Sequence, residues 1–368
     1  MQKVIGFVYL YTSFQLDETY LKDESKGGLG GSETWLIQIS AELAKNPDYH
    51  IIVFCNCESW HFSEDGVEFV PLYLMPSRCK YQHFDAMIIG RLFDNFDMNI
   101  NTIIKETNCC DNVYALAQDL CFWKINVEID YIKNKDEIDY IKKFFVLSDF
   151  HKQFFITQLH FPENRVVIIP DGVDLELFKD VDIFNNERDH GILWSSLYHR
   201  NFSIVADKIY PLVKKEIPDF KIYTCQYHEN LPEKYKDNED IISLGSLSKK
   251  ELYKERAKHP VFFYPNHIAE TFCITVLEAA ICGNDIVIPN LYGPADILNP
   301  YSDFLLPNDP KYFDNEENCQ NAANMIIDSI LNYNTPHKVK LRNSIRNYII
   351  KRFNWTIIGK NMLKEMNI

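Results

Sequence analysis

The sequence predicts an α/β protein with two domains, each built around a doubly wound parallel sheet. The chain has 368 residues, which exceeds the usual size of one hydrophobic core. Short apolar segments of strand length alternate along it with segments long enough for helices. We therefore expect two domains of roughly 170–190 residues, the first of which ends near Pro170.

The first domain begins with a strand, a glycine-rich loop, a helix and a second strand. The apolar segments 3–10 and 51–55 predict the two strands, and the apolar periodicity of 32–45 predicts the helix. The loop holds Gly30 and Gly31, but no lysine follows them as in a Walker loop. It is either a flexible connection before a capped helix or a place where backbone amides approach a phosphate or a sugar.

The remaining elements follow the same alternation. Further strands of the first domain are predicted at 86–89, 113–117, 144–147 and 166–169. The second domain is predicted to contain strands at 191–194, 221–225, 241–245, 261–264 and 285–289, with helices at 202–214, 249–258 and 338–351.

The segment 261–297 is the most informative part of the chain. Its first strand is followed by a helix with Thr271 as the expected N-cap and Gly283 at the C-terminal end. A right-handed strand–helix–strand crossover places the start of that helix at the carboxyl edge of the sheet. The amides of Thr271, Phe272, Cys273 and Ile274 would then favour an anion such as a diphosphate.

Two carboxylates flank this anion site. Glu270 and Glu278 are separated by roughly 12 Å if the helical rise applies throughout. They make chemical sense if each accepts hydrogen bonds from hydroxyls at opposite ends of an extended ligand, one on a sugar and one on a ribose. A simpler interpretation makes Glu278 a solvated residue of the helix surface and Glu270 a carboxylate stabilised by the helix dipole.

The pattern as a whole resembles the E-x7-E signature of retaining glycosyltransferases of family 4, which have the GT-B fold. The residues that carry the resemblance are Pro265, Glu270, Phe272, Leu277, Glu278, Ala279, Cys282, Gly283 and Gly293. The resemblance implies that Glu270 contacts the donor sugar and Glu278 the ribose, while the backbone around Phe272 and Cys273 binds the diphosphate. Many family members have Gly where Cys273 stands.

Other segments extend the resemblance. Gly30 and Gly31 match the loop glycines that approach the donor, and Arg200 matches a basic residue that holds the leaving diphosphate. Two positions depart from the family. Ser195 stands where many members have a second arginine, and Gln118 stands where many have a histidine near the donor sugar. Gln118 can hydrogen-bond a hydroxyl but cannot act as an acid or a base.

Lesser matches support the fold implied by the resemblance. The sequence IPDGVDLELF near 170 resembles the family's crossing between domains, with Asp171 in place of Asn, and FNWTIIGKNMLKEM at the C-terminus resembles its final helix. The resemblance therefore implies two Rossmann-like domains facing a central cleft. It makes 1–170 the acceptor-side domain and 171–350 the donor-binding domain, with 351–368 crossing back onto the first domain.

Charge and hydropathy exclude several partners and locations. The net charge is −14 and no basic run tracks a phosphate backbone, so we expect no nucleic-acid binding. No apolar stretch reaches membrane-spanning length and no cleavage site follows the N-terminal apolar segment, so we expect a cytoplasmic protein. The mixed-charge stretch 133–143 could form at most a weak peripheral membrane contact.

We predict neither a metal site nor a cofactor beyond the nucleotide sugar. Cys55/Cys57 and Cys109/Cys110 lack zinc-ligand spacing with histidines, and Asp180-Val181-Asp182 lies in a polar linker away from any strand end. The ten cysteines are expected to be reduced, because Cys55, Cys121, Cys225, Cys273 and Cys282 fall in apolar strand or helix contexts.

Together with this resemblance, the sequence predicts a retaining, metal-independent glycosyltransferase of glycan or polysaccharide biosynthesis. It would move a sugar from a UDP- or GDP-hexose donor to a hydroxyl of a saccharide, a lipid-linked sugar or a protein, with Glu270, Arg200 and Gln118 as catalytic residues. Two alternatives stay open. One is a catalytically silent family member that binds a sugar nucleotide or acts as a scaffold, and the other is a GT-B epimerase that needs no acceptor.

Overall fold

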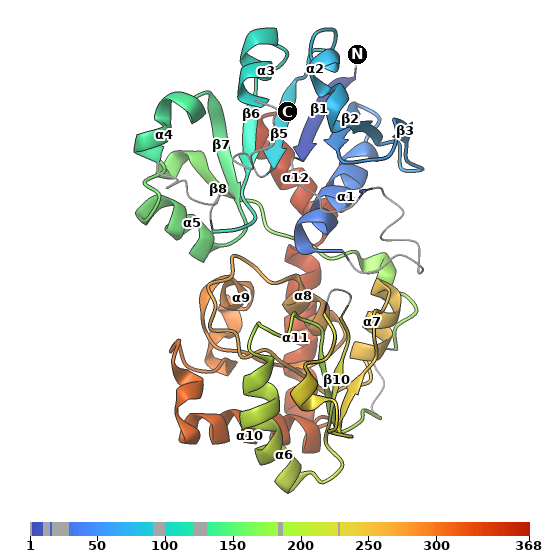
Figure 1. Cartoon of the computed structure of the whole chain (residues 1–368), viewed down its shortest axis with the longest axis vertical. Coiled ribbons are helices and arrows are strands. Elements are labelled where there is room, and N and C mark those ends of the chain that lie inside the picture. Colours follow the sequence, from blue (N-terminus) through green and yellow to red (C-terminus); the bar gives the residue numbers. More distant parts are fainter. Residues whose placement is uncertain are drawn as a thin grey trace. The chain divides into compact units, whose positions relative to one another are not determined.

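The computed structural model describes residues 2–9, 15–16, 29–90, 100–120, 131–182, 187–226 and 229–368 (Figure 1). They form two compact units. Unit 1 contains the described residues up to Gly172 together with Trp355–Ile368, and unit 2 contains those from Val173 to Asn354. Each unit is described by itself.

Unit 1 is built on an eight-stranded sheet of order β3-β4-β2-β1-β5-β6-β7-β8. All neighbouring strands are parallel except β3 and β4. The strands are β1 (Lys3–Tyr9), β2 (Tyr49–Cys55), β3 (His61–Phe62), β4 (Glu68–Pro71), β5 (Ala86–Gly90), β6 (Val113–Leu116), β7 (Ile141–Val146) and β8 (Val166–Ile168).

The helices of unit 1 connect these strands. They are α1 (Gly31–Ala44), α2 (Met75–Arg78), α3 (Ile100–Thr107), α4 (Tyr131–Ile138), α5 (Asp149–Thr157) and α12 (Trp355–Met366). Helix α12 belongs to this unit although it ends the chain, and it packs against α1. Its last turn is held by Tyr114 Oη, which donates to the Met366 carbonyl at 2.9 Å, and by an ion pair of 2.8 Å between Lys143 and Glu365.

Unit 2 is built on a five-stranded parallel sheet of order β11-β10-β9-β12-β13. Its strands are β9 (Gly191–Trp194), β10 (Lys221–Thr224), β11 (Ile241–Ser243), β12 (Val261–Phe263) and β13 (Asp285–Val287). Its helices are α6 (Tyr210–Glu216), α7 (Lys249–Arg256), α8 (Ile274–Ile281), α9 (Tyr292–Ile297), α10 (Glu316–Leu331) and α11 (Pro336–Arg352). The chain runs from β9 to one side of the sheet and returns to the other side at β12, which makes the β9/β12 boundary a topological switch point.

The predicted helix over 271–283 is wrong at its start. Helix α8 begins at Ile274 with Cys273 as the N-cap, and Thr271 lies in the preceding loop. That loop has its own hydrogen bonds, because Asn266 Oδ1 accepts from the Ile268 amide at 3.0 Å and the Gly293 amide donates to the Glu270 carbonyl at 2.9 Å. The helical rise therefore does not apply to the whole interval between the two glutamates.

Other elements also differ from the prediction. The helix predicted at 202–214 is a π-helix over Ile204–Ile209 that continues as α6. Strand β4 was not predicted, because Glu68 interrupts its apolar pattern. Glu68 is nonetheless buried, with its carboxylate held 3.0 Å from Arg78 Nη2 and 2.9 Å from Trp60 Nε1. In the described parts of the chain, no helix combines the length and the apolar character that crossing a bilayer would require.

Candidate functional site

The predicted site residues of unit 2 gather at the switch point between β9 and β12. Arg200 follows β9, and Glu270 follows β12 in the loop that leads into α8. Both loops leave the carboxyl ends of parallel strands, where open α/β sheets bind their ligands. Arg200 Nη1 lies 2.6 Å from Glu270 Oε1, so the fold joins two residues that are seventy positions apart in sequence.

Two further side chains hold the Glu270 carboxylate. Tyr264 Oη and Asn266 Nδ2 each donate to Glu270 Oε2 at 3.2 Å. Both residues come from the segment directly after β12, so the strand end, the loop and the carboxylate form one hydrogen-bonded assembly. Arg200 and Glu270 keep 41% and 20% of their side-chain surface exposed, which leaves both groups within reach of a ligand.

Burial and the ion pair act in opposite directions on these groups. Burial raises the pKa of the Glu270 carboxyl, and the Arg200 guanidinium and Tyr264 only partly offset it. Burial also disfavours the charged form of Arg200, but Glu270, Tyr264 and Cys273 together outweigh this effect and raise the pKa of the guanidinium. Arg200 therefore stays charged, and Glu270 is a carboxylate that takes up a proton more readily than a solvated one.

The start of α8 lies directly after this assembly. The first amides of a helix have no partner inside the helix, so those of Ile274 and Thr275 are suited to an anion. Gly293, in α9, lets this helix pack closely against the loop that precedes α8. A Cβ atom built on Gly293 would lie 2.2 Å from the Thr271 carbonyl oxygen, so only glycine allows this packing of α9 against the loop.

Glu278 is not a solvated carboxylate of the helix surface. Its side chain is 3% exposed, and Oε1 accepts from Lys249 Nζ at 2.6 Å and from Tyr253 Oη at 2.8 Å. Burial favours the neutral acid, but Lys249 and Arg256 more than compensate and lower the pKa of Glu278. Glu278 is therefore an ionised hydrogen-bond acceptor inside unit 2.

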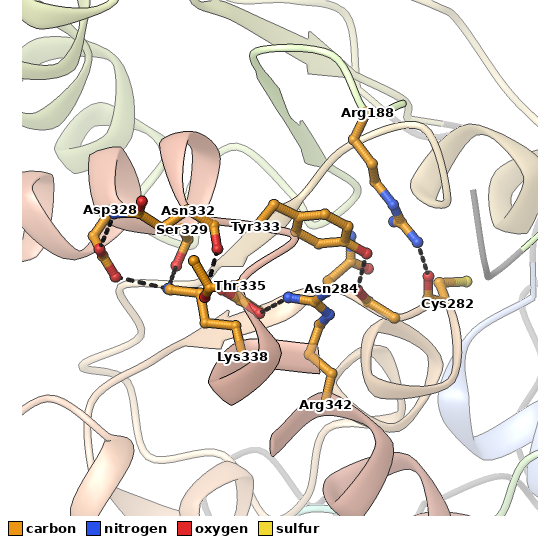
Figure 2. A network of polar contacts seen from close by, with 12 residues as sticks. Arg188, Cys282, Asn284, Asp328, Ser329, Asn332, Tyr333, Thr335, Lys338 and Arg342 are labelled. Carbon is orange, nitrogen blue, oxygen red and sulfur yellow. Dashed lines mark hydrogen bonds and ion pairs between the residues drawn. The ribbon is translucent and has the colours of Figure 1, made fainter. Parts of the chain in front are cut away.

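The C-terminal end of α8 is held by a separate polar network (Figure 2). Gly283 has a φ of +75° and ends the helix as predicted. Tyr333 Oη donates to the Gly283 carbonyl at 2.7 Å, and Arg188 Nη2 donates to the Cys282 carbonyl at 2.8 Å. Arg342 lies over the Tyr333 ring, 3.6 Å from its centroid, and pairs with Asp285. These contacts fix the helix axis and with it the position of the helix start.

The remaining predicted site residues lie in unit 1. Gly30 is the N-cap of α1 and Gly31 is its first residue, so their amides belong to a helix start as well. A Cβ on Gly30 would lie 2.5 Å from the Glu33 carboxylate. Gln118 follows β6 and its Oε1 accepts from Tyr9 Oη at 2.9 Å, which ties it to the end of β1.

Possible metal ligands and most of the described cysteines lie in other parts of the chain. Within the described residues, no three His, Cys, Asp or Glu side chains come together as a metal site. Asp180 of the D-x-D sequence pairs with Lys250 at 3.0 Å. The described cysteines are buried free thiols, whereas Cys121 lies outside the described residues.

Sequence reasoning missed several residues of this site. The apolar pattern predicts only a strand that ends at Tyr264 and a helix over 249–258, and it assigns no role to Asn266, Lys249, Tyr253 or Arg256. The spacing of Lys249, Tyr253 and Arg256 in the KKELYKER segment places them on one face of α7. That face could have been noted, but which carboxylate it meets depends on the packing of α7 against α8.

Comparisons with known proteins find similar structures but no similar sequences. No protein-family profile matches the sequence, and no curated protein matches it significantly. Among solved structures, a glycosyltransferase from Rickettsia africae ESF-5 is similar with a TM-score of 0.70 at 15% identity, covering 100% of this chain and 98% of that one. Sucrose-phosphate synthase from Thermosynechococcus elongatus gives 0.69 at 14% identity, with the same coverage.

A third similar structure contains ligands. Anabaena HepE in complex with UDP and glucose has a TM-score of 0.64 at 14% identity, and the similarity covers 100% of both chains. At such identities the likeness concerns the fold. Together with the two parallel sheets described above, it shows that the chain has the GT-B fold of two Rossmann-like domains that its sequence predicts.

Proposed function

We propose that this protein is a glycosyltransferase that moves a hexose-type sugar from a UDP- or GDP-linked donor to a hydroxyl group of an acceptor. The observation that carries the proposal is the Arg200–Glu270 pair, at 2.6 Å, between the β9/β12 switch point and the start of α8. A diphosphate needs a cation and amide donors, and a sugar needs a hydrogen-bond acceptor. All three kinds of group are adjacent here.

Arg200 is assigned to the leaving diphosphate. In the free protein one of its nitrogen atoms contacts Glu270, and a guanidinium has five N–H donors in a fixed fork. The remaining donors suit phosphate oxygens, and charge-assisted contacts of this kind stabilise the negative charge that develops as the glycosidic bond breaks. The amides at the start of α8 add to the same effect.

Glu270 is assigned to the donor sugar and Glu278 to the nucleoside. An ionised carboxylate accepts hydrogen bonds from two or more hydroxyls, which is what a sugar or a ribose offers. Lys249 and Tyr253 both contact Oε1 of Glu278, so Oε2 is the oxygen assigned to the ribose. The similarity to HepE, whose structures contain UDP with glucose or UDP-glucose, supports a donor of this class.

We further propose that transfer retains the anomeric configuration and uses no metal ion. The acceptor hydroxyl attacks C1 of the sugar on the face that the diphosphate leaves, a C–O bond forms as the C1–O bond to the phosphate breaks, and the departing diphosphate takes the acceptor's proton. Arg200 then supplies the positive charge that a metal ion would otherwise provide. Gly30, Gly31 and Gln118 of unit 1 are assigned to the transferred sugar.

A donor panel tests this proposal. UDP-, GDP- and ADP-sugars are added with and without EDTA, and binding is read by thermal shift while slow hydrolysis of the donor is followed. One donor should stabilise the wild type and be hydrolysed regardless of EDTA, and Glu270→Ala should lose both effects. Glu233→Ala is the matched control, since that carboxylate is exposed and lies outside the site.

The outcomes separate the alternatives. Binding of a donor without hydrolysis or transfer to a broad set of acceptors would replace this proposal by a silent nucleotide-sugar-binding subunit. Loss of activity in EDTA would contradict the metal-independent mechanism. Product formed from the donor alone, with the sugar epimerised, would instead identify an epimerase.

A further inference from the structure

Arg256, the last residue of α7, is almost fully buried. Its guanidinium contacts Ser195, the residue that follows β9. Only 1% of Arg256 is exposed, and its Nη2 donates to Ser195 Oγ at 2.6 Å. The guanidinium also lies 5.3 Å from the centroid of the Phe262 ring on β12. A charge buried to this extent is costly unless it is paired, and Arg256 is near enough to Glu278 to help lower the pKa of that carboxyl.

Ser195 is the residue that receives this contact, and it lies at the switch point. It follows β9 directly and lines a cavity together with Tyr264, Cys273 and Thr275. The cavity, about 10 Å³ in volume, has room for one water molecule at most, but its lining shows that Ser195 lies beside the start of α8, where the amides suited to a diphosphate lie. Ser195 is half-buried, so part of the residue is accessible to a ligand at the switch point, whereas Arg256 is not.

The direction of the hydrogen bond determines what Ser195 can offer. Arginine can only donate, so Ser195 Oγ is the acceptor and keeps its own hydrogen for another partner. In the described parts of the chain, this hydroxyl makes no second hydrogen bond. Donation from a cation polarises the O–H group and strengthens the bond that it donates in turn.

We propose that Ser195 donates a hydrogen bond to the diphosphate of the donor, and that Arg256 is a positioning residue that orients and polarises this hydroxyl from behind. The inference rests on the proposed function and adds a second cationic contribution beside Arg200. It also accounts for Ser195 at a position where the family that the chain resembles often has arginine. Arg256 on α7 supplies the positive charge, and the Ser195 hydroxyl is the group that contacts the ligand.

A binding experiment with four proteins tests the inference. Affinities for UDP and GDP, and for the nucleosides uridine and guanosine, are measured by calorimetry for wild type, Ser195→Ala, Arg256→Lys and the double variant. Ser195→Ala should weaken binding of the recognised diphosphate by about 10-fold or more, because a hydrogen bond to a charged group is lost. The matching nucleoside, which has no phosphate, should bind as before.

The double variant tests the relay itself. If Arg256 acts through Ser195, then Arg256→Lys should weaken diphosphate binding in the wild type but cause no further loss in the Ser195→Ala background. Ser203→Ala removes an exposed hydroxyl outside the cavity and should bind like the wild type. Ser195→Thr keeps the hydroxyl and should retain most of the affinity.

Each result has a defined meaning. Unchanged diphosphate binding in Ser195→Ala would overturn the inference even if Arg256→Lys fails to fold. Additive losses would overturn the relay, because they would mean that Arg256 acts independently of Ser195. If the wild type binds neither UDP nor GDP while its folded state is intact, the proposed function itself fails. A drop in nucleoside affinity equal to that of the diphosphate would show a structural role only.

Discussion

Lys249 and Glu278 form an ion pair of 2.6 Å that is almost entirely enclosed by unit 2. The lysine begins α7 and the glutamate lies in the middle of α8, so the pair joins two helices that follow different strands of the sheet. A carboxylate in such a place stays ionised only because its partner is fixed beside it. The pair therefore sets both the stability of the unit and the protonation state of Glu278.

Removing one partner of this pair should be much worse than removing both. We expect Lys249→Met to lower the free energy of unfolding by about 3 kcal/mol, because it leaves Glu278 buried without its counter-ion. The double variant Lys249→Met/Glu278→Gln should recover most of that loss. Urea denaturation of the wild type, both single variants and the double variant measures the coupling, and equal losses in single and double variants would contradict it.

Arg200 should matter for turnover more than for stability. Its side chain is 41% exposed, so Arg200→Ala should change the free energy of unfolding little. If Arg200 stabilises the leaving diphosphate, kcat/KM for transfer or donor hydrolysis should fall by about 100-fold or more. Arg200→Lys keeps the charge but loses the fork of donors and should fall in between. Equal activity in all three proteins would remove Arg200 from the mechanism.

Gly293 should tolerate no side chain. The Cβ of Gly293→Ala would lie 2.2 Å from a backbone oxygen, so the loop that carries Glu270 must shift. We expect a destabilisation of about 1–3 kcal/mol from this overpacking, together with a larger loss of donor binding. In the helical control Gly359→Ala, the nearest atoms to the new Cβ all belong to side chains, the closest being that of Leu43 at 3.3 Å. Thermal denaturation and donor affinity of both variants test the difference.

The stability of unit 1 should depend on pH through His151. The ring is fully buried, its Nδ1 accepts from the Leu147 amide at 3.2 Å, and burial lowers its pKa from 6.5 to about 3. Below pH 6.5 the unfolded chain binds a proton that the folded chain refuses. The free energy of unfolding should therefore fall as the pH drops from 6.5 toward 3, by up to about 1.4 kcal/mol per unit from this group.

Comparison with a variant isolates this contribution. His151→Phe removes the titrating ring, so its free energy of unfolding should fall less steeply with pH than that of the wild type. His160→Asn, at an exposed histidine, should leave the wild-type slope unchanged. Parallel slopes for His151→Phe and the wild type in urea titrations between pH 7 and 4 would contradict the assignment.

The sequence was sufficient for most of the strands and several of the helices, because apolar runs and helical periodicity are local, but it did not predict α10. It also indicated Glu270 and the crossover from β12 through α8 to β13, since their motif is compact, whereas Arg200 was indicated only by the family resemblance. It did not indicate β4, whose buried Glu68 is compensated by Arg78 and Trp60 from neighbouring segments. The start of α8 was misplaced for the same reason, because hydrogen bonds from Asn266 and Gly293 hold 266–273 out of the helix.

In the site, too, contacts between segments distant in sequence could not be predicted. The interpretation of Glu278 as a solvated carboxylate was reasonable from an isolated helix, and only the packing of α7 against α8 reveals the buried pair with Lys249. The contact between Arg256 and Ser195 spans sixty-one positions, and no local pattern marks it. Long-range pairing of polar groups is thus the part of this site that a single sequence leaves open.

The buried thiols provide a built-in reporter of local opening. Cys55, Cys57, Cys79, Cys109 and Cys110 belong to unit 1, whereas Cys225, Cys273, Cys282 and Cys319 belong to unit 2. A thiol reagent can modify each of them only when its surroundings open, so modification rates resolved by peptide mass spectrometry measure how often each region unfolds. The two Rossmann-like units can then be ranked by opening free energy in the intact chain, without inserted probes, and modification of Cys273 with and without added nucleotide tests the proposed donor site.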